Sequence, residues 1–243
     1  IAGTPASPLV ARDSNPGTVR LSPGGVGRNI AHNLALLGVE THLVTVFGED
    51  ALADALVESC TEVGVDLSGA EAVVGGSTST YLYVTDETGE MQVAINDMAI
   101  LENLTPALLE RKRAVIDAAE VVVAETNLPV ETLRWICDEV RVPVFCDPIS
   151  TVKAHKLEGL LGRMHVLKPN RLEAEVLSGR AIADERDLAH AARDLLDTGL
   201  DQAFVSLGSQ GLLCATAAET VRLAPLPCQL ASTNGAGDAM MAG

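Results

Sequence analysis

The sequence predicts an α/β protein, in which a three-layer, doubly wound and mostly parallel sheet bears a small antiparallel β lid. Helical and strand patterns alternate from about residue 105 onward, which is typical of right-handed βαβ units and an open parallel sheet. Aromatic residues make up only 2% of a chain that is 47% hydrophobic. Aliphatic side chains must therefore build the core, as suits a parallel sheet covered by helices.

The first half of the chain combines amphipathic helices with an alternating segment. The pattern predicts a glycine turn entering a helix, then a strand, then a second helix, at residues 24–38, 41–48 and 49–64. Residues 72–96 alternate with period two around a short turn, which indicates an antiparallel meander. We expect a lid formed by about residues 1–22 and 72–97, attached to one domain that spans residues 1–243.

The second half predicts helices at 105–118, 129–140, 153–160, 170–178 and 184–198, and strands at 121–124, 142–147, 164–168 and 203–207. An edge hairpin is expected within 211–230. In open parallel sheets, ligands bind beyond the carboxyl ends of the strands. The polar and glycine positions there are Asn127, Asp147, Lys168, Asn170, Gly208, Gly211 and residues 234–238.

Charge and cysteine content exclude several classes of protein. A formal net charge of −16 argues against nucleic-acid binding, which usually needs a basic face. No apolar run reaches the roughly 20 residues of a membrane span. The five cysteines lack metal or CxxC spacing and lie in apolar segments, so we expect reduced thiols in a cytoplasmic protein.

The segment NGAGD, residues 234–238, precedes a run of small and apolar residues. Glycines at a helix entrance let the backbone approach a ligand, and the free N–H groups of the first turn favour an anion. We interpret the amides of Gly235, Ala236 and Gly237 as a phosphoryl site and Asp238 as a base for an attacking hydroxyl. The alternative is that Asp238 is an ordinary first-turn acid.

Neither glycine cluster completes a nucleotide-binding fingerprint of the common kinds. No GxxxxGK[ST] occurs, and the GxGxxG pattern fails at its third glycine at residue 30 and again at Met240. Dinucleotide binding, and with it an oxidoreductase on this fold, is therefore disfavoured.

Four motifs in order resemble those of the ribokinase/PfkB family of carbohydrate and nucleoside kinases. They are PGGVGRNIA at 23–31, KPNRLEAE at 168–175, VSLGSQG at 205–211 and GAGD at 235–238. The segments DSNPG at 13–17 and GEMQVAINDM at 89–98 are similar, more narrowly, to the bacterial pseudouridine kinases within that family. The resemblance implies a ribokinase-like fold and transfer of phosphate from ATP to an alcohol.

The resemblance also implies a substrate side of the site. Gly24 and Gly25 would pass beneath a ribose, and Asn29 would bind its hydroxyls. Asn127 would hold the sugar, although it also reads as a helix N-cap. Asn96 and Asp97 are candidates for hydrogen bonding to the edge of the base. The alternative is that they belong to a simple turn.

On the nucleotide side, the resemblance assigns Lys168 to a phosphate, and Asn170 with Glu173 to Mg²⁺ through water. The alternative for Lys168 is a solvated lysine, and the alternative for Asn170 and Glu173 is a capping box. The ATP channel would be lined by Ser206, Gly208, Gly211 and Thr233. The alternative is that these residues only form a loop. Ser232-Thr233 stands where the family often has Asp-Thr, which leaves a K⁺ site in doubt.

Together these features predict an ATP- and Mg²⁺-dependent kinase of the 5′-hydroxyl of pseudouridine. The alternatives are kinases of ribose, adenosine, fructose or a deoxyketogluconate, or a silent nucleoside-binding protein. The partner is a small molecule, with no nucleic acid or membrane, and a homodimer through the β lid is expected by analogy. The chain starts without Met and stops early in a helix, so we expect a fragment that lacks the family's first strand and C-terminal helices.

Overall fold

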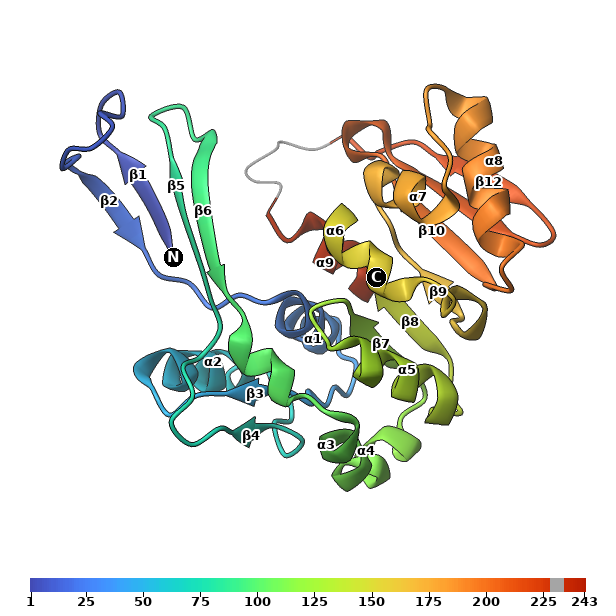
Figure 1. Ribbon diagram of the computed structural model, residues 1–243, viewed down its shortest axis with the longest axis horizontal. Coiled ribbons are helices and arrows are strands. Elements are labelled where there is room, and N and C mark those ends of the chain that lie inside the picture. Colours follow the sequence, from blue (N-terminus) through green and yellow to red (C-terminus); the bar gives the residue numbers. More distant parts are fainter. Residues whose placement is uncertain (228–233) are drawn as a thin grey trace.

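A six-stranded sheet forms the centre of the protein in the computed structural model, which describes residues 1–227 and 234–243. Its strands run in the order β12-β11-β10-β9-β8-β7. They are β7 (Val122–Glu125), β8 (Val144–Asp147), β9 (Val166–Leu167), β10 (Gln202–Ser206), β11 (Leu212–Thr216) and β12 (Thr220–Leu223). β7 to β10 pair in parallel, and β11 and β12 add an antiparallel edge hairpin (Figure 1).

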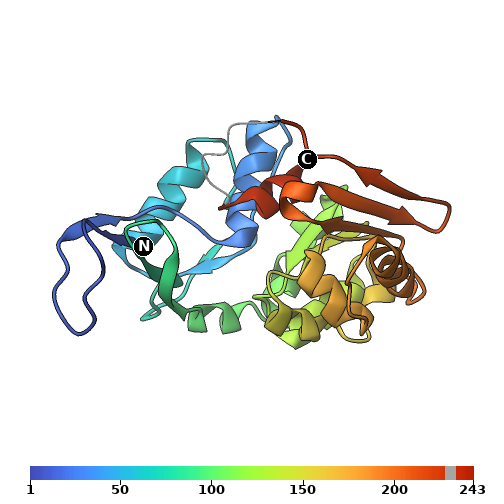
Figure 2. The ribbon, with the colours of Figure 1, turned by 90° about the horizontal axis from the view of Figure 1, so that it is seen from above.

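Helices cover both faces of this sheet, which makes the three layers that the sequence predicts (Figure 2). One face carries α1 (Val26–Leu36) and α9 (Ala236–Ala242), and the other carries α5 (Val130–Glu139), α7 (Arg171–Ser178) and α8 (Glu185–Leu196). The remaining helices are α2 (Ala51–Thr61), α3 (Pro106–Arg111), α4 (Arg113–Ala118) and α6 (Thr151–Ala154), with 3-10 turns η1 (Ala99–Asn103), η2 (His155–Leu157), η3 (Leu161–Arg163) and η4 (Gly208–Gln210). Within the described ranges, none of the helices has the length and apolar character needed to cross a bilayer.

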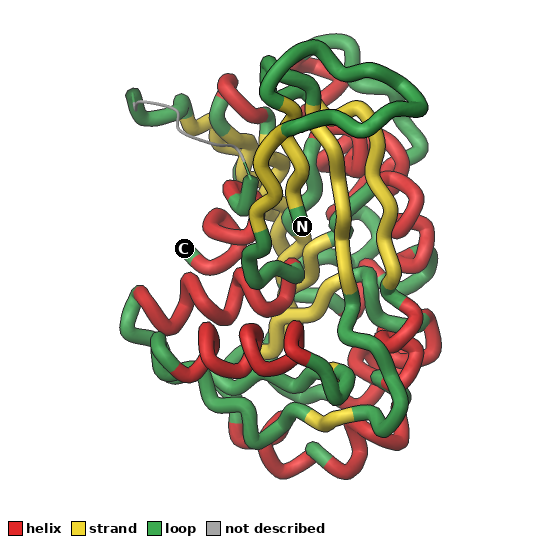
Figure 3. Tube along the Cα trace, turned by 90° about the vertical axis from the view of Figure 1, so that its left-hand side faces the viewer, coloured by secondary structure: helices red, strands yellow, loops and turns green. Residues whose placement is uncertain are grey.

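A separate four-stranded sheet stands beside the main body, and Figure 3 shows its outer side. It has the order β2-β1-β5-β6 and consists of β1 (Ala2–Pro5), β2 (Gly17–Arg20), β5 (Thr80–Thr85) and β6 (Met91–Asp97). The meander is thus present as β5 and β6. Residues 71–72 form β4 (Glu71–Ala72), which pairs with β3 (Val46–Phe47) in a third, two-stranded sheet.

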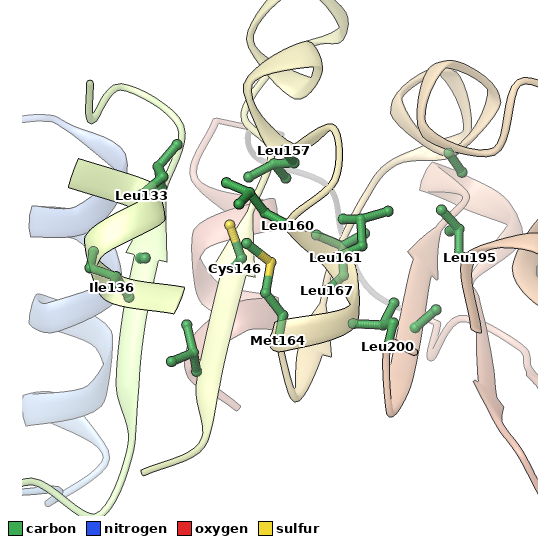
Figure 4. Packing of buried hydrophobic residues seen from close by; sticks show 14 of the residues in the cluster. Leu133, Ile136, Cys146, Leu157, Leu160, Leu161, Met164, Leu167, Leu195 and Leu200 are labelled. Atoms are coloured by element: carbon green, nitrogen blue, oxygen red, sulfur yellow. The ribbon is translucent and has the colours of Figure 1, made fainter. Parts of the chain in front are cut away.

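Aliphatic side chains build the main core, as the composition predicts. Leu133, Leu157, Leu167 and Leu195 are at most 1% exposed and lie between the sheet and the helices of one face (Figure 4). Burial of such side chains is the dominant stabilising contribution in a domain of this kind. The core therefore fixes the carboxyl ends of β7, β8 and β9 next to one another at one edge of the sheet.

Several predicted elements are shorter in the structure. The strand predicted at 41–48 is reduced to β3, joined by a bridge from His42 to Asp66. The helix predicted at 105–118 divides at Lys112 into α3 and α4. The helix predicted at 153–160 is one turn of α6 followed by η2, and the positive φ of 73° at Gly159 prevents any helical continuation to residue 160.

Candidate active site

The two glycine motifs, far apart in sequence, meet where α1 packs against α9. α1 begins directly after Gly25, whose φ of 96° is a conformation that side chains other than glycine rarely adopt. Asn29, on the first turn of α1, donates from Nδ2 to Oδ2 of Asp238 at 2.8 Å. The predicted ribose turn and the predicted phosphoryl site therefore form one site.

Asp238 is a buried carboxylate with a polar neighbour on either side. Burial raises its pKa above the ordinary value, while the hydrogen bond from Asn29 lowers it. The charge of Asp147 adds to the increase and that of Lys168 opposes it. Among the described residues Asp238 makes no ion pair within 4 Å, so its charge is not neutralised by direct contact.

The start of α9 presents free backbone donors. Gly235 is its N-cap, with φ 77°, and the first hydrogen bond within the helix runs from Ala239 N to Gly235 O at 2.9 Å. The amides of Ala236, Gly237 and Asp238 therefore have no partner inside the helix. Such amides favour an anion. Two of them, Ala236 and Gly237, belong to the predicted phosphoryl site.

Lys168 is not the solvated lysine that was the alternative reading. It follows β9, is 5% exposed, and its Nζ lies 3.1 Å from Oδ2 of the equally buried Asp147. Asp147 also accepts a hydrogen bond from Ile149 N through Oδ1 at 2.8 Å. A methyl group built on Gly237 would lie 3.4 Å from Nζ, so the ammonium group is adjacent to the first turn of α9.

Asn170 and Glu173 form the capping box at the start of α7. Glu173 Oε2 accepts from Asn170 N at 2.8 Å, and its Oε1 accepts from Asn170 Nδ2 at 2.7 Å. Burial raises the pKa of Glu173, while the bond from Asn170 N lowers it. In residues 1–227 and 234–243 no group of three or more His, Cys, Asp or Glu side chains is arranged to hold a metal directly. The pair therefore fits Mg²⁺ only through water and phosphate oxygens.

A cavity of about 2510 Å³ runs along α1 and α9 and extends to the four-stranded sheet and past β7. The predicted residues that line it are Gly24, Gly25, Asn29, Asn96, Asn127, Gly235 and Ala236. Asp97 is not among them. Because adjacent side chains of a strand alternate between faces, Asp97 lies on the face of β6 opposite to Asn96, and its carboxylate accepts from Ala99 N at 3.3 Å. The contact of Asp97 with the edge of the base stays a prediction.

Of the other predicted nucleotide-side residues, Ser206 contacts Asn170, whereas Gly208 and Gly211 lie in the turn that follows β10. Ser206 forms a bridge with Asn170, and its N donates to Pro169 O at 2.9 Å. Gly208 and Gly211 shape the turn around η4, with φ of 58° and 86°. A methyl group on Gly211 would lie 2.1 Å from Leu223 O, so the turn by itself requires glycine there. Thr233 lies outside the described residues.

Three charged residues that the motifs do not include also belong to the site. The sequence places Asp147 at the end of a predicted strand, and its pairing with Lys168 depends on the alignment of β8 and β9. Lys153 donates from Nζ to Oδ1 of Asn127, and Glu125 accepts from Asn127 N at 2.7 Å. Glu125 and Asp147 could have been found in the sequence from their positions at the ends of strands. No feature of the sequence indicates Lys153.

Glu125 makes the folding free energy depend on pH. Burial raises its pKa from 4.5 to about 7, while the bond from Asn127 N and the charge of Lys153 lower it. A raised pKa means that the folded state binds the proton more tightly, so stability is full below pH 4.5 and declines as pH rises through about 7.

We expect Glu125→Gln to remove on the order of 2 kcal/mol of this pH dependence. The glutamine cannot ionise, so the variant gains stability relative to the parent as pH rises. Urea unfolding at pH 5 and pH 8 measures the effect, with the exposed Glu131→Gln on α5 as control. The same change in unfolding free energy between pH 5 and pH 8 for the parent and Glu125→Gln would contradict this prediction.

A parallel sheet with helices on both faces, a helix start with free amides and an adjacent carboxylate are features that a small-molecule phosphotransferase needs. Residues 6–243 match the pfkB family carbohydrate kinases. The chain belongs to this family.

Individual relatives agree with the family assignment. The chain is 42% identical over 245 residues to the pseudouridine kinase of Escherichia coli, which covers 100% of this chain and 78% of that protein. It is also 42% identical over 234 residues to the uncharacterized sugar kinase YeiI of Escherichia coli, covering 95% of this chain and 64% of the relative. A putative sugar kinase from Clostridium perfringens superimposes with a TM-score of 0.83 at 33% identity, covering 99% of this chain and 77% of that one.

Proposed function

We propose that this protein phosphorylates the 5′-hydroxyl of pseudouridine with ATP. The observation that supports this most directly is the hydrogen bond from Asn29 to Asp238, because it joins a sugar-binding turn to the acid of an anion-binding helix start. The similarity to the pseudouridine kinase of Escherichia coli supports the choice of acceptor.

Under this proposal each residue has a role in phosphoryl transfer. Asp238 accepts the proton of the attacking hydroxyl, and Asn29 orients both this carboxylate and the ribose. The amides of residues 235–237 stabilise the charge that develops on the transferred group. Lys168, held by Asp147, lies next to these amides and adds a positive charge.

Asn170 and Glu173 are suited to ordering the water shell of Mg²⁺, which supplies charge neutralisation for the ATP phosphates when bound. Ser206, Gly208, Gly211 and Thr233 are proposed to border the nucleotide. The free thiols of Cys60, Cys137, Cys146 and Cys214 support a reducing, cytoplasmic location.

The four-stranded sheet is proposed to act as a lid over the substrate. Asn96 lies on the side of β6 that faces the cavity, where it can contact the base. The other side exposes apolar residues, with Val19 79%, Val93 53% and Ile95 66% exposed. Such a face supports a homodimer that pairs the two lids.

An acceptor panel tests the proposed function. The protein is assayed with ATP and Mg²⁺ against pseudouridine, uridine, ribose, adenosine and fructose, and the product is identified by mass and by the site of phosphorylation. We expect pseudouridine to have the highest kcat/KM. Faster turnover of another acceptor overturns the choice of substrate, and calorimetric binding of pseudouridine without ATP consumption would indicate a silent binding protein.

A further inference from the structure

The loops that follow β7 and β8 are joined by four hydrogen bonds around Asn127. Two come from Thr126, whose N donates to Asp147 O at 3.2 Å and whose Oγ1 donates to Pro148 O at 2.5 Å. The other two come from lysines of the α6–η2 segment. Lys153 Nζ donates to Asn127 Oδ1, and Lys156 Nζ donates to Leu128 O at 2.9 Å.

A strained residue sets the direction of α6. Ile149 has a φ of 61°, which is rare for a β-branched residue, and it lines the cavity. The conformation is held by the bond from Ile149 N to Asp147 and by the N-cap Ser150, which accepts from Lys153 N at 3.3 Å. Strain of this kind is retained where it places a functional group. Here it brings the side chain of Lys153 to the substrate cavity.

The contact with Lys153 determines which way the amide of Asn127 points. An ammonium group only donates, so the oxygen of the amide must face Lys153 and the nitrogen must face away from it. The backbone N of Asn127 is bound separately by Glu125 at 2.7 Å. Within the part of the chain that the structure describes, Nδ2 makes no hydrogen bond, and Asn127 lines the cavity.

The charges around Asn127 also favour an electron-rich ligand. Lys153 and Lys156 approach from the α6–η2 segment, and Glu125 approaches from β7. Burial lowers the pKa of Lys153, whereas the charge of Glu125 raises it. Burial raises the pKa of Glu125 to about 7, so at neutral pH one partly protonated carboxyl faces two lysines.

We propose that Lys153 is a positioning residue that makes Asn127 an obligate hydrogen-bond donor to an acceptor oxygen of the nucleoside, an inference that rests on the function proposed above. The acceptor is either an oxygen of the sugar or a carbonyl of the base. A substrate that presents only an N–H donor at this point would meet Nδ2 and be disfavoured, whereas a hydroxyl can rotate and accept.

Two variants test the orientation of the amide. Asn127→Asp keeps the contact with Lys153 and strengthens it with charge, but the carboxylate cannot donate. Lys153→Met frees the amide to rotate. We expect KM for pseudouridine to rise about tenfold for Asn127→Asp and about fivefold for Lys153→Met, with a smaller change in kcat.

Lys156→Met is the matched control, because Lys156 supports the same loop through a backbone carbonyl and not through Asn127. It should change KM by less than about twofold. Equal effects of Lys153→Met and Lys156→Met would mean that the lysines only anchor the loop, which overturns the proposal. An unchanged KM for Asn127→Asp overturns it too, since no donor would then be in use.

Two further measurements separate this inference from the proposed function. The Tm of each variant confirms folding, and Asn127→Asp should be at least as stable as the parent. KM or the calorimetric Kd is measured with the acceptor that the parent protein uses or binds best, so a wrong substrate assignment does not prevent the test. Equal losses with ribose and pseudouridine place the acceptor oxygen on the sugar, and a loss with pseudouridine alone places it on the base.

Discussion

Asp238→Asn is expected to lower kcat by about 10² to 10⁴, the usual contribution of a general base. The asparagine has the same shape and can still accept from Asn29, but it cannot take a proton. Affinity for ATP with Mg²⁺ should be unchanged, because the amides of residues 235–237 remain. Steady-state kinetics and calorimetry with a non-hydrolysable ATP analogue measure the two quantities separately.

A second substitution distinguishes catalysis from helix capping. Asp54 is an exposed first-turn acid of α2, so Asp54→Asn should change stability by roughly 0.3–1 kcal/mol and leave turnover unchanged. Stability of Asp238→Asn should equal or exceed that of the parent at neutral pH, because burial disfavours the carboxylate charge. If Asp238→Asn keeps wild-type turnover and loses only a little stability, Asp238 acts as an ordinary first-turn acid and not as a base.

Asp147→Asn is expected to destabilise the protein by about 3–5 kcal/mol, because it leaves the ammonium of Lys168 buried without its partner. The asparagine can keep the bond to Ile149 N through Oδ1, so the loss reports mainly on the charge. Urea unfolding measures the change. Asp194→Asn, which removes the exposed pair with Arg180, should cost less than about 1 kcal/mol.

The double variant Asp147→Asn with Lys168→Met separates stability from function. Removing both charges should recover most of the lost stability, since no unpaired charge remains buried. Activity should stay low, because the positive charge next to the first turn of α9 is gone. Recovery of both stability and turnover would show that Lys168 has no part in the reaction, and failure to recover stability would show that the pair is not the source of the loss.

The elements that could be predicted are those with strong local patterns. The glycine turn and helical period of residues 24–38 predict α1, and the alternation of residues 72–96 predicts the meander that forms β5 and β6. The boundaries of β3, α3 and α4 were less accurate, because these elements end where tertiary contacts stop and not at a strong local signal. The sequence did not distinguish Asn96 from Asp97 at the base, because one residue of register changes the face of a strand.

By itself, the sequence determined the α/β class and the order of most elements, because these depend on local period and on residue type, and it predicts the chemistry of the glycine-flanked acid at position 238. Only the tertiary structure decided that Asn29 bonds Asp238, that Asp147 pairs with Lys168, and that Lys153 turns the amide of Asn127. The partners in these contacts are between 21 and 209 residues apart or are set by the register of neighbouring strands. Their meeting depends on how helices and strands pack around the core, which no local pattern encodes.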